Sequence, residues 1–244
     1  MYTIIKQSLI RIVPKNILFK LEPLIRFALY QFYRGKTYQC SICEKRLRRF
    51  VQLGEDKLCP NCGSLSRDRR LWEILSSEFL TEQAEVLDFS PSRSLYRVLK
   101  EISLISYSST DLSGDFLSDY QYDIANIDAP DQKYDLIICY HVLEHIENDY
   151  QAISEMYRVL KKEGTCIIQT PFKQGSIYEN LSIKSKEARL KHFGQKDHVR
   201  IYSINGLKER LIANGFDVAV KEYNEPEENI FGFKQNEVIL ICTK

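Results

Sequence analysis

Short apolar runs alternate with stretches of helical periodicity from residue 84 onward, and this alternation limits the fold more than any other feature. The runs predicted to be strands are Glu85–Phe89, Ile102–Thr110, Tyr122–Ala125, Tyr134–Cys139, Thr165–Thr170, Asp217–Glu222 and Glu237–Thr243. Between them, helical periodicity covers Ser92–Glu101, Asn148–Leu160 and Ile204–Asn214. Strands that alternate with helices form a mostly parallel sheet with helices on both faces. We therefore expect an α/β fold with a doubly wound, seven-stranded sheet.

Acidic residues lie at the ends of the first three predicted strands, as Asp88, Asp111 and Asp123. Ligands of such sheets bind beyond the carboxyl ends of the strands, and an acid about 20 residues after the first suits ribose hydroxyls. Each acid alone is typical of a turn or a helix cap, but together they favour a nucleoside site on a Rossmann-like sheet. The chain contains no Gly-x-Gly. The fingerprint for a dinucleotide pyrophosphate is therefore absent.

The charge is unevenly distributed, although the formal net charge is only +1. Residues 1–36 hold seven Lys or Arg and one acid, and residues 37–72 hold eight basic and four acidic residues. One or two amphipathic helices are expected within residues 3–34, broken or started at Pro14 and Pro23. Peripheral membrane contact through residues 1–36 is the minor alternative to packing on the protein itself. Without a long apolar stretch or a secretory signal, we expect a cytoplasmic protein.

Four of the seven cysteines form two Cys-x-x-Cys pairs, Cys40 with Cys43 and Cys59 with Cys62. This spacing is typical of a ribbon in which four thiolates close the tetrahedral shell of a structural Zn²⁺ ion. Two disulfides are the weaker alternative, because they belong to secreted proteins. The remaining cysteines lie in apolar runs and are expected in the core: Cys139, Cys166 and Cys242.

These patterns divide the chain into four expected parts. Residues 1–36 form a basic amphipathic helical segment, and residues 37–66 form the zinc ribbon. Residues 67–83 contain a linking helix, and residues 84–244 form the sheet domain.

The fourth predicted strand runs into His141-Val142-Leu143-Glu144-His145, and Met156-Tyr157-Arg158-Val159-Leu160 precedes Lys161-Lys162-Glu163-Gly164. With the strand-end acids, these segments make residues 85–243 resemble class I S-adenosylmethionine-dependent methyltransferases. A subgroup with a four-cysteine ribbon is similar also in the segment Gly194-Gln195-Lys196-Asp197-His198-Val199-Arg200. One departure concerns the first loop, where the family usually carries glycines and this chain has Phe-Ser-Pro-Ser-Arg-Ser after Asp88.

The resemblance implies S-adenosylmethionine as cofactor and assigns roles to the strand ends. Asp88 and the turn Phe89-Ser90-Pro91 would face the methionine part of the cofactor. The implied ribose and adenine contacts are Asp111, Leu112, Asp123 and Ile124. Tyr140 and His141 would lie near the sulfonium, and His141 is also counted among the catalytic candidates.

Methyl transfer is an in-line displacement, and a hydroxyl acceptor benefits from a positioned base, usually histidine. His198 is the first candidate for that base, with Asp197 to orient it and with His192 and His145 as alternatives. Gln195 and Arg200 would hold a polar or anionic acceptor, and Glu179 would reach the same site. A surface pair between Asp197 and Arg200 stays an open alternative. The expected reaction is O-methylation of a small-molecule or sugar/glycan acceptor.

Two other functions compete with this interpretation. An RNA methyltransferase would use Arg46, Arg48, Arg49, Arg67, Arg69 and Arg70 as its basic surface. Against it, no Asn/Asp-Pro-Pro-Tyr/Phe sequence follows the fourth strand. A catalytically inactive adaptor with a methyltransferase fold is supported only by the glycine-free first loop.

The segment His141-x-x-Glu144-His145 also matches the inverted zinc-protease pattern. That pattern requires both histidines on one helical face, whereas here they directly follow a strand. No catalytic metal is therefore expected from the sequence.

Overall fold

The computed structural model describes residues 15–244 of the chain. Its residues form two compact units. The first contains the residues up to Ile74 together with Glu225–Lys234, and the second contains Leu75–Asn224 and Gln235–Lys244. Residues 225–234, which the sequence analysis grouped with the sheet domain, thus pack with the first unit.

A single mixed sheet forms the centre of the second unit. Its strands are β5 (Glu85–Phe89), β6 (Ser106–Thr110), β7 (Tyr134–Tyr140), β8 (Leu160–Gln169), β11 (Asp217–Tyr223) and β12 (Glu237–Thr243). They lie in the order β11-β12-β8-β7-β5-β6. The neighbours from β8 to β6 pair in parallel, whereas β12 is antiparallel to both β11 and β8. This arrangement confirms the expected Rossmann-like α/β class.

The third predicted strand, Tyr122–Ala125, is wrong: within residues 15–244 the main sheet has six strands. In the described part of the chain, a single parallel bridge between Thr110 and Tyr120 extends the sheet beyond β6. The Asp123 carboxylate accepts a hydrogen bond from the backbone N–H of Ala125 at 2.9 Å. Aspartate often bends the chain through such a bond to its own backbone, and here the bend ends the extended segment.

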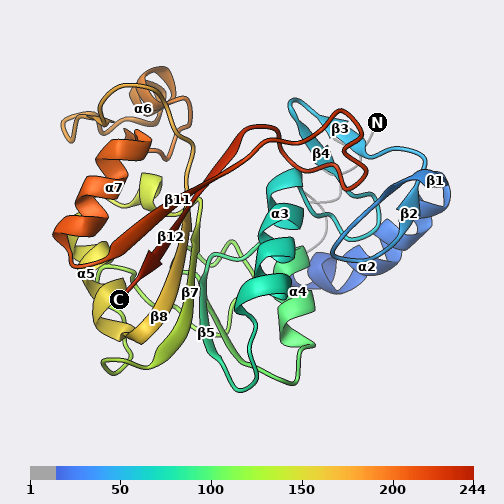
Figure 1. Ribbon diagram of the computed structural model, residues 1–244. Helices are drawn as coiled ribbons and strands as arrows, with labels where there is room; N and C mark the ends of the chain where they lie inside the picture. The colour runs from blue at the N-terminus through green and yellow to red at the C-terminus, as the bar shows by residue number, and fades with distance from the viewer. Residues whose placement is uncertain (1–14) are drawn as a thin grey trace. The chain divides into compact units, whose positions relative to one another are not determined.

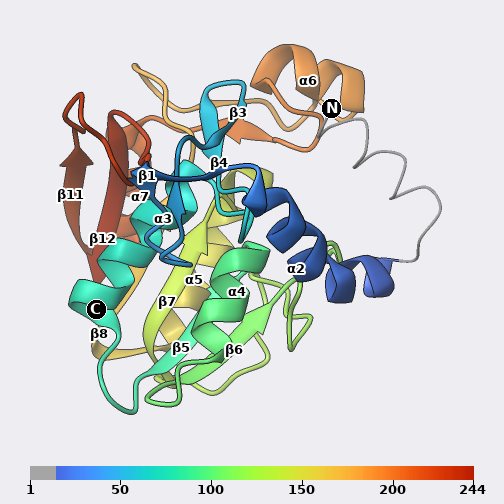
Figure 2. The same ribbon diagram turned by 90° about the vertical axis from the view of Figure 1, so that its right-hand side faces the viewer.

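Helices cover both faces of this sheet. Figures 1 and 2 show α4 (Arg93–Lys100) on one face and α5 (Asp149–Val159) with α7 (Ile204–Ala213) on the other. Each helix begins after a polar cap whose side chain accepts a backbone N–H: Ser92 from Leu95, Asn148 from Gln151, and Ser203 from Gly206. Such caps satisfy backbone donors that a helix leaves unpaired. The predicted helix starts were therefore close to the observed ones.

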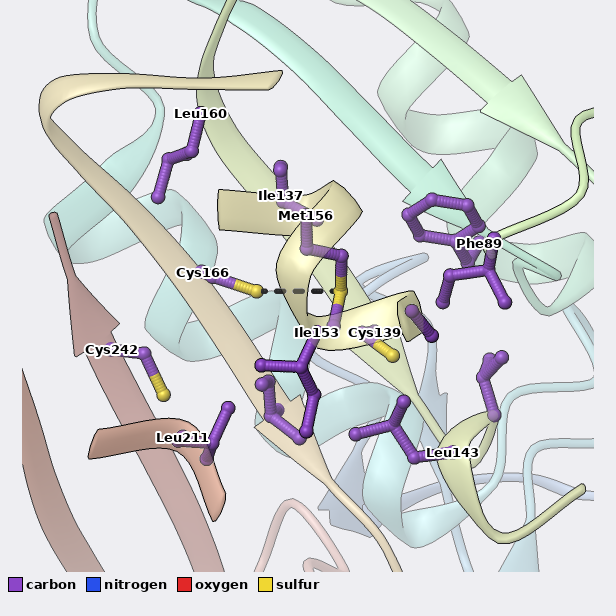
Figure 3. Packing of buried hydrophobic residues seen from close by; sticks show 14 of the residues in the cluster. Phe89, Ile137, Cys139, Leu143, Ile153, Met156, Leu160, Cys166, Leu211 and Cys242 are labelled. Atoms are coloured by element: carbon purple, nitrogen blue, oxygen red, sulfur yellow. Dashed lines mark hydrogen bonds between the residues drawn. The ribbon is translucent and has the colours of Figure 1, made fainter. Parts of the chain in front are cut away.

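The main core lies between the sheet and helices α5 and α7 (Figure 3). Alternate strand residues point to it, as the two-residue period of a strand requires. Cys139, Cys166 and Cys242 are fully buried there, so their prediction as core residues is confirmed. The sulfur of Cys166 lies 3.9 Å from that of Met156 on α5. Burial raises the pKa of each of these three thiols, which keeps them neutral.

The first unit combines helices with two small hairpins. Helix α2 (Lys15–Gln31) precedes β1 (Arg34–Gln39), β2 (Arg46–Leu47), β3 (Val51–Leu53), β4 (Asp56–Leu58) and helix α3 (Ser66–Ile74). The expected break at Pro23 is wrong, because α2 continues through it. Pro14 and the preceding residues lie outside the described residues. The predicted linking helix is α-helical in α3 and continues as a π-helix, η1 (Leu75–Phe79), in the second unit.

Helix α2 exposes apolar side chains, among them Leu24, Phe27 and Ile17. Arg26 and Tyr30 are buried instead, and Tyr30 packs with Leu47 and Phe50. No helix within residues 15–244 is long and apolar enough to cross a membrane. Membrane contact through residues 1–36 stays a prediction.

Candidate functional site

The parallel strands β5, β6, β7 and β8 finish at one edge of the sheet, and most predicted site residues follow these ends. The segment that carries β9 (Tyr178–Glu179), α6 (Lys186–Phe193) and β10 (Arg200–Ile201) lies at this same end in Figures 1 and 2. A parallel bridge between Phe172 and Tyr202 joins the two sides of the segment. We refer to the carboxyl ends of these four strands and the loops after them as the carboxyl edge.

The two acids at the ends of β5 and β6 are both buried. The Tyr107 hydroxyl donates to Asp88 at 2.9 Å. Burial, and then the charge of Asp88, raises the pKa of Tyr107 well above its usual value. Asp111 accepts from the hydroxyls of Ser90 and Ser113, each at 2.8 Å, and from the N–H of Asp115 at 3.0 Å. These contacts fix both carboxylates at the carboxyl edge.

The glycine-free loop after β5 bends at Ser90, which has a φ of 51°. This left-handed conformation is easy for glycine and unfavourable by about 1–2 kcal/mol for most other residues. The Ser90 hydroxyl reaches Asp111, and its N–H donates to the carbonyl of Thr110 at 2.8 Å. The loop therefore makes a glycine-like turn without glycine, and Pro91 behind it is buried.

The remaining residues predicted for the cofactor are dispersed. The side chains of Phe89 and Ile124 belong to the main core. Leu112 and Asp123 are exposed instead. The Tyr140 hydroxyl donates to Glu237 at 3.2 Å, on β12.

A cluster of histidines and one glutamate follows β7. One possible ligand atom from each of Glu144, His145 and His198 lies within 4.8 Å of the other two. We call these three residues the His–Glu cluster. The rings of His145 and His198 meet edge to face with 4.7 Å between their centroids. His141, in a left-handed conformation with φ 57°, has its Nδ1 atom 3.2 Å from Oε1 of Glu144.

Two features bring this cluster together from distant parts of the chain. Glu144 and His145 lie in a short 3₁₀ helix, η2 (Leu143–His145), and the carbonyl of Glu144 accepts the N–H of Val199 at 2.9 Å. Next to it, the buried Arg200 donates to the carbonyls of Leu143, Ile146 and Glu147. Arg200 thereby holds the loop after β7 in place.

Burial and charge set the protonation of the cluster. Burial, followed by the charge on His145, lowers the pKa of His198. Burial would raise the pKa of Glu144, but the hydrogen bond from His141 and its charge outweigh it, and the pKa is lowered. The arrangement favours a neutral His198 beside a carboxylate, which is what a proton acceptor requires.

The structure does not gather the other predicted acceptor residues around His198. The Asp197 carboxylate lies 3.4 Å from Nδ1 of His145 and therefore contacts that ring. Within the described chain, Asp197 forms an ion pair with neither Arg200 nor His198. Glu179 accepts from Arg200 at 3.0 Å and from Arg210 at 2.6 Å. His192 bonds to the Tyr178 hydroxyl at 2.7 Å, and Gln195 is exposed after α6.

Three buried oxygens at the carboxyl edge have no hydrogen-bond partner within residues 15–244. They are Oε2 of Glu144, Oε1 of Gln169 and Oγ1 of Thr170. Gln169 ends β8 directly beside Tyr140, and Thr170 follows it. Buried polar atoms are almost always hydrogen-bonded, so such exceptions mark places for a ligand or water. The sequence analysis did not select these residues, although Glu144 lies within the His-Val-Leu-Glu-His segment.

The two Cys-x-x-Cys pairs converge in the first unit. The sulfurs of Cys40 and Cys62 are 3.6 Å apart, and those of Cys43 and Cys59 are 3.7 Å apart. Four sulfurs at about 2.3 Å from one zinc ion lie roughly 3.8 Å from one another, so this geometry fits the metal. Gly63 takes a φ of 82°, which lets the second pair turn, and a Cβ there would meet the Arg26 guanidinium.

The thiols of this cluster compete for protons. Hydrogen bonds from Cys43, Cys59 and Cys62 lower the pKa of Cys40, whereas bonds to Cys40 raise the pKa of Cys59 and Cys62. Four thiolates so close together need a cation to balance their charge. Nearby, the buried Arg69 donates to the carbonyls of Ser64, Lys57, Phe231 and Gly232.

Comparison with known proteins identifies the family. The sequence pattern of a methyltransferase domain family matches residues 64–220, more than half of the chain. The chain belongs to this methyltransferase family. No curated protein matches the sequence.

Solved structures confirm the fold of this methyltransferase. A SAM-dependent methyltransferase from Archaeoglobus fulgidus is 17% identical, with a TM-score of 0.54 over 73% of this chain and 93% of that one. One from Mesorhizobium loti is 13% identical, with a TM-score of 0.53 over 71% and 97%. A chain of the complex between the Haloferax volcanii Trm112 methyltransferase activator and a methyltransferase is 12% identical, with a TM-score of 0.53 over 72% and 93%. The protein is thus a methyltransferase with the fold of SAM-dependent enzymes.

Proposed function

We propose that the protein transfers a methyl group from S-adenosylmethionine to a hydroxyl of a small-molecule or sugar/glycan acceptor. When bound, this cofactor supplies a methyl group on a positively charged sulfonium. The carboxyl edge suits such a cofactor, because two buried carboxylates lie there together with three buried oxygens that have no hydrogen-bond partner within residues 15–244. Those unpartnered oxygens are the observation that carries the proposal.

Each strand end has a separate part in holding the cofactor. Asp111, at the end of β6, would bind the ribose hydroxyls, with Leu112 and the Asp123–Ile124 turn beside the adenine. Asp88 and the backbone of the turn Phe89-Ser90-Pro91 would face the methionine part. Tyr140 and His141 would lie near the sulfonium, with Gln169 and Thr170 next to them as hydrogen-bond acceptors.

His198 is proposed as the base that accepts the proton of the acceptor hydroxyl. Its lowered pKa keeps the ring neutral near pH 7, and the carboxylate of Glu144 stabilises the imidazolium that forms. His141 holds Glu144, and Asp197 orients His145. Gln195 and His192, on the exposed inserted segment, would contact the acceptor. Arg200 and Glu179 bind one another, so we assign them to positioning the loop after β7.

We also propose that the four cysteines of the first unit bind a structural zinc ion. Cys40, Cys43, Cys59 and Cys62 would close its coordination shell and leave no position for a substrate. Its role is to hold the two hairpins together, because one cysteine pair lies between β1 and β2 and the other follows β4.

An RNA acceptor is the second candidate. Arg46, Arg48 and Arg49 are exposed, as an RNA-binding surface requires, but Arg69 and Arg70 are buried and do not contribute to one. Fewer arginines than the sequence suggested are therefore available to bind RNA phosphates.

The test is transfer of a labelled methyl group from S-adenosylmethionine to a panel of sugars, sugar nucleotides and structured RNA. We expect label in a hydroxyl-bearing sugar, loss of transfer in His198→Gln, and normal transfer in Lys196→Ala, a change at an exposed neighbour. Labelling of RNA alone, weakened by added salt, would contradict the proposal and support the second candidate.

A further inference from the structure

We propose that the His–Glu cluster binds a divalent transition-metal ion, at a second site separate from the four cysteines. Glu144, His145 and His198 each offer one ligand atom, and these atoms lie within 4.8 Å of one another. Two imidazole nitrogens and one carboxylate oxygen are a donor set that suits zinc and its neighbours, and three protein ligands leave one position open.

Glu144 is the ligand for which the structure gives the clearest reason. Its side chain is almost fully buried, and Oε1 is already held by His141 at 3.2 Å. Oε2 is also buried, and within residues 15–244 it has no hydrogen-bond partner. A buried carboxylate oxygen without a partner is unfavourable, and a cation coordinated by the two histidines would satisfy it.

A carboxylate orients one of the two histidines, His145. Nδ1 of His145 faces the Asp197 carboxylate at 3.4 Å, which leaves Nε2 of the same ring for a metal. A carboxylate behind a metal-binding histidine is a common outer-shell arrangement, because it fixes the ring. His145 is partly exposed and His198 is buried, so the ion would enter from the side of His145.

The backbone around the cluster is also fixed before any ion binds. The N–H of Val199, next to His198, donates to the carbonyl of Glu144 at 2.9 Å. Arg200 binds the carbonyl of Leu143, the first residue of the 3₁₀ helix, and that of Glu147, two residues after its end. Ligands preorganised in this way lose little conformational freedom on binding a metal.

The metal site bears on catalysis if the proposed role of His198 as the base is correct. A histidine nitrogen that coordinates a metal cannot accept a proton at the same time. An ion in the His–Glu cluster would therefore compete with the acceptor proton for His198. Excess transition metal would inhibit methyl transfer, although metal binding itself does not depend on the methylation proposal.

The test counts zinc ions per chain by elemental analysis after zinc-loaded protein is passed through a desalting column. We expect two ions in the wild type and one in His145→Ala and in Glu144→Gln. Glu147→Gln, which changes an exposed carboxylate two residues beyond His145, should retain two. One ion in both the wild type and the variants would overturn the second site.

Cobalt substitution provides a readout that does not require any variant to fold. A second Co²⁺ ion in the wild-type protein should add visible d–d absorption without further sulfur-to-cobalt charge transfer, because its ligands are nitrogen and oxygen. If the d–d absorption rises only together with the charge-transfer absorption, all bound cobalt has sulfur ligands, and the proposal is overturned. In activity assays, filling the second site should reduce transfer at least about tenfold. A filled site with unchanged activity would leave the metal site standing and overturn the base role of His198.

Discussion

The four-cysteine cluster of the first unit and the carboxyl edge of the second both contain buried polar atoms, but they use these atoms differently. Around the cysteines, the sulfurs contact one another and the guanidinium of Arg69 donates to four carbonyls. At the carboxyl edge, Glu144, Gln169 and Thr170 each keep a buried oxygen without a partner in the described chain. A metal held by the four cysteines would stabilise the fold, whereas buried oxygens without a partner in the described chain mark a place for a ligand.

Zinc removal should give the largest effect. In zinc-finger peptides the metal contributes about 10–16 kcal/mol, so chelation or Cys59→Ser should unfold the two hairpins. Hydrogen exchange should then accelerate over residues 37–66 and much less over β5, β7 and β8. As a control, Cys242→Ala removes a core thiol and should leave the zinc content unchanged. Full protection of residues 37–66 in metal-free protein would show that the ribbon is stable by itself.

Replacing Arg69 should have the next largest effect. Arg69→Met leaves buried carbonyls unpaired, and we expect a loss of about 3 kcal/mol or more. Zinc release during a urea titration measures the stability of this unit directly. Arg46→Met, at an exposed arginine, should change stability by less than about 0.5 kcal/mol. Equal midpoints for the two variants would contradict the role given to Arg69.

Loss of the proposed base should affect the reaction but not the fold. His198→Ala should lower kcat by about 10²–10⁴-fold with little change in cofactor affinity. The base acts when unprotonated, and its lowered pKa means that activity is present near pH 7 and is lost only as pH falls below about 6.5. If activity already falls at a pH above about 6.5, or if the His198→Ala variant shows the same fall at low pH, His198 is not the base.

Two buried threonines at strand ends give the smallest but sharpest comparison. Thr170→Val removes an oxygen that has no hydrogen-bond partner within residues 15–244, so stability should stay level or rise by up to about 1 kcal/mol while cofactor affinity falls. Thr110→Val removes the oxygen that accepts the N–H of Tyr122 at 2.7 Å, and should destabilise by about 1–2 kcal/mol. Thermal unfolding and cofactor titration of both variants measure these changes. Similar destabilisation in both would mean that Thr170 has a structural partner.

Local sequence patterns predicted much of this fold. Apolar periodicity located the six strands, and capping residues such as Ser92 and Asn148 marked the helix starts. The thiol spacing predicted the convergence of Cys40 with Cys62. The strand predicted at Tyr122–Ala125 failed because Asp123 bends its own backbone, a choice that apolar content alone does not reveal.

The carboxyl edge was harder to predict, because its contacts join residues far apart in the sequence. Asp197 precedes His198 directly but faces His145, which lies 52 positions earlier. Arg200 was selected for an acceptor, yet its guanidinium holds the loop after β7. Whether a buried polar atom has a hydrogen-bond partner depends on all of its neighbours in the fold. The sequence around Gln169 and Thr170 therefore gave no indication that their side-chain oxygens would lack one in the described chain.

The most direct test of this account is calorimetric titration of S-adenosylmethionine and S-adenosylhomocysteine into zinc-loaded protein. We predict micromolar binding that is lost in Asp111→Ala and retained in Asp115→Ala, an exposed acid of the same loop. Hydrogen exchange on both variants would verify that the loop after β6 remains folded. No binding of either ligand to the wild type would contradict the proposed cofactor site. It would mean that the glycine-free loop at Ser90 closes the carboxyl edge to the cofactor.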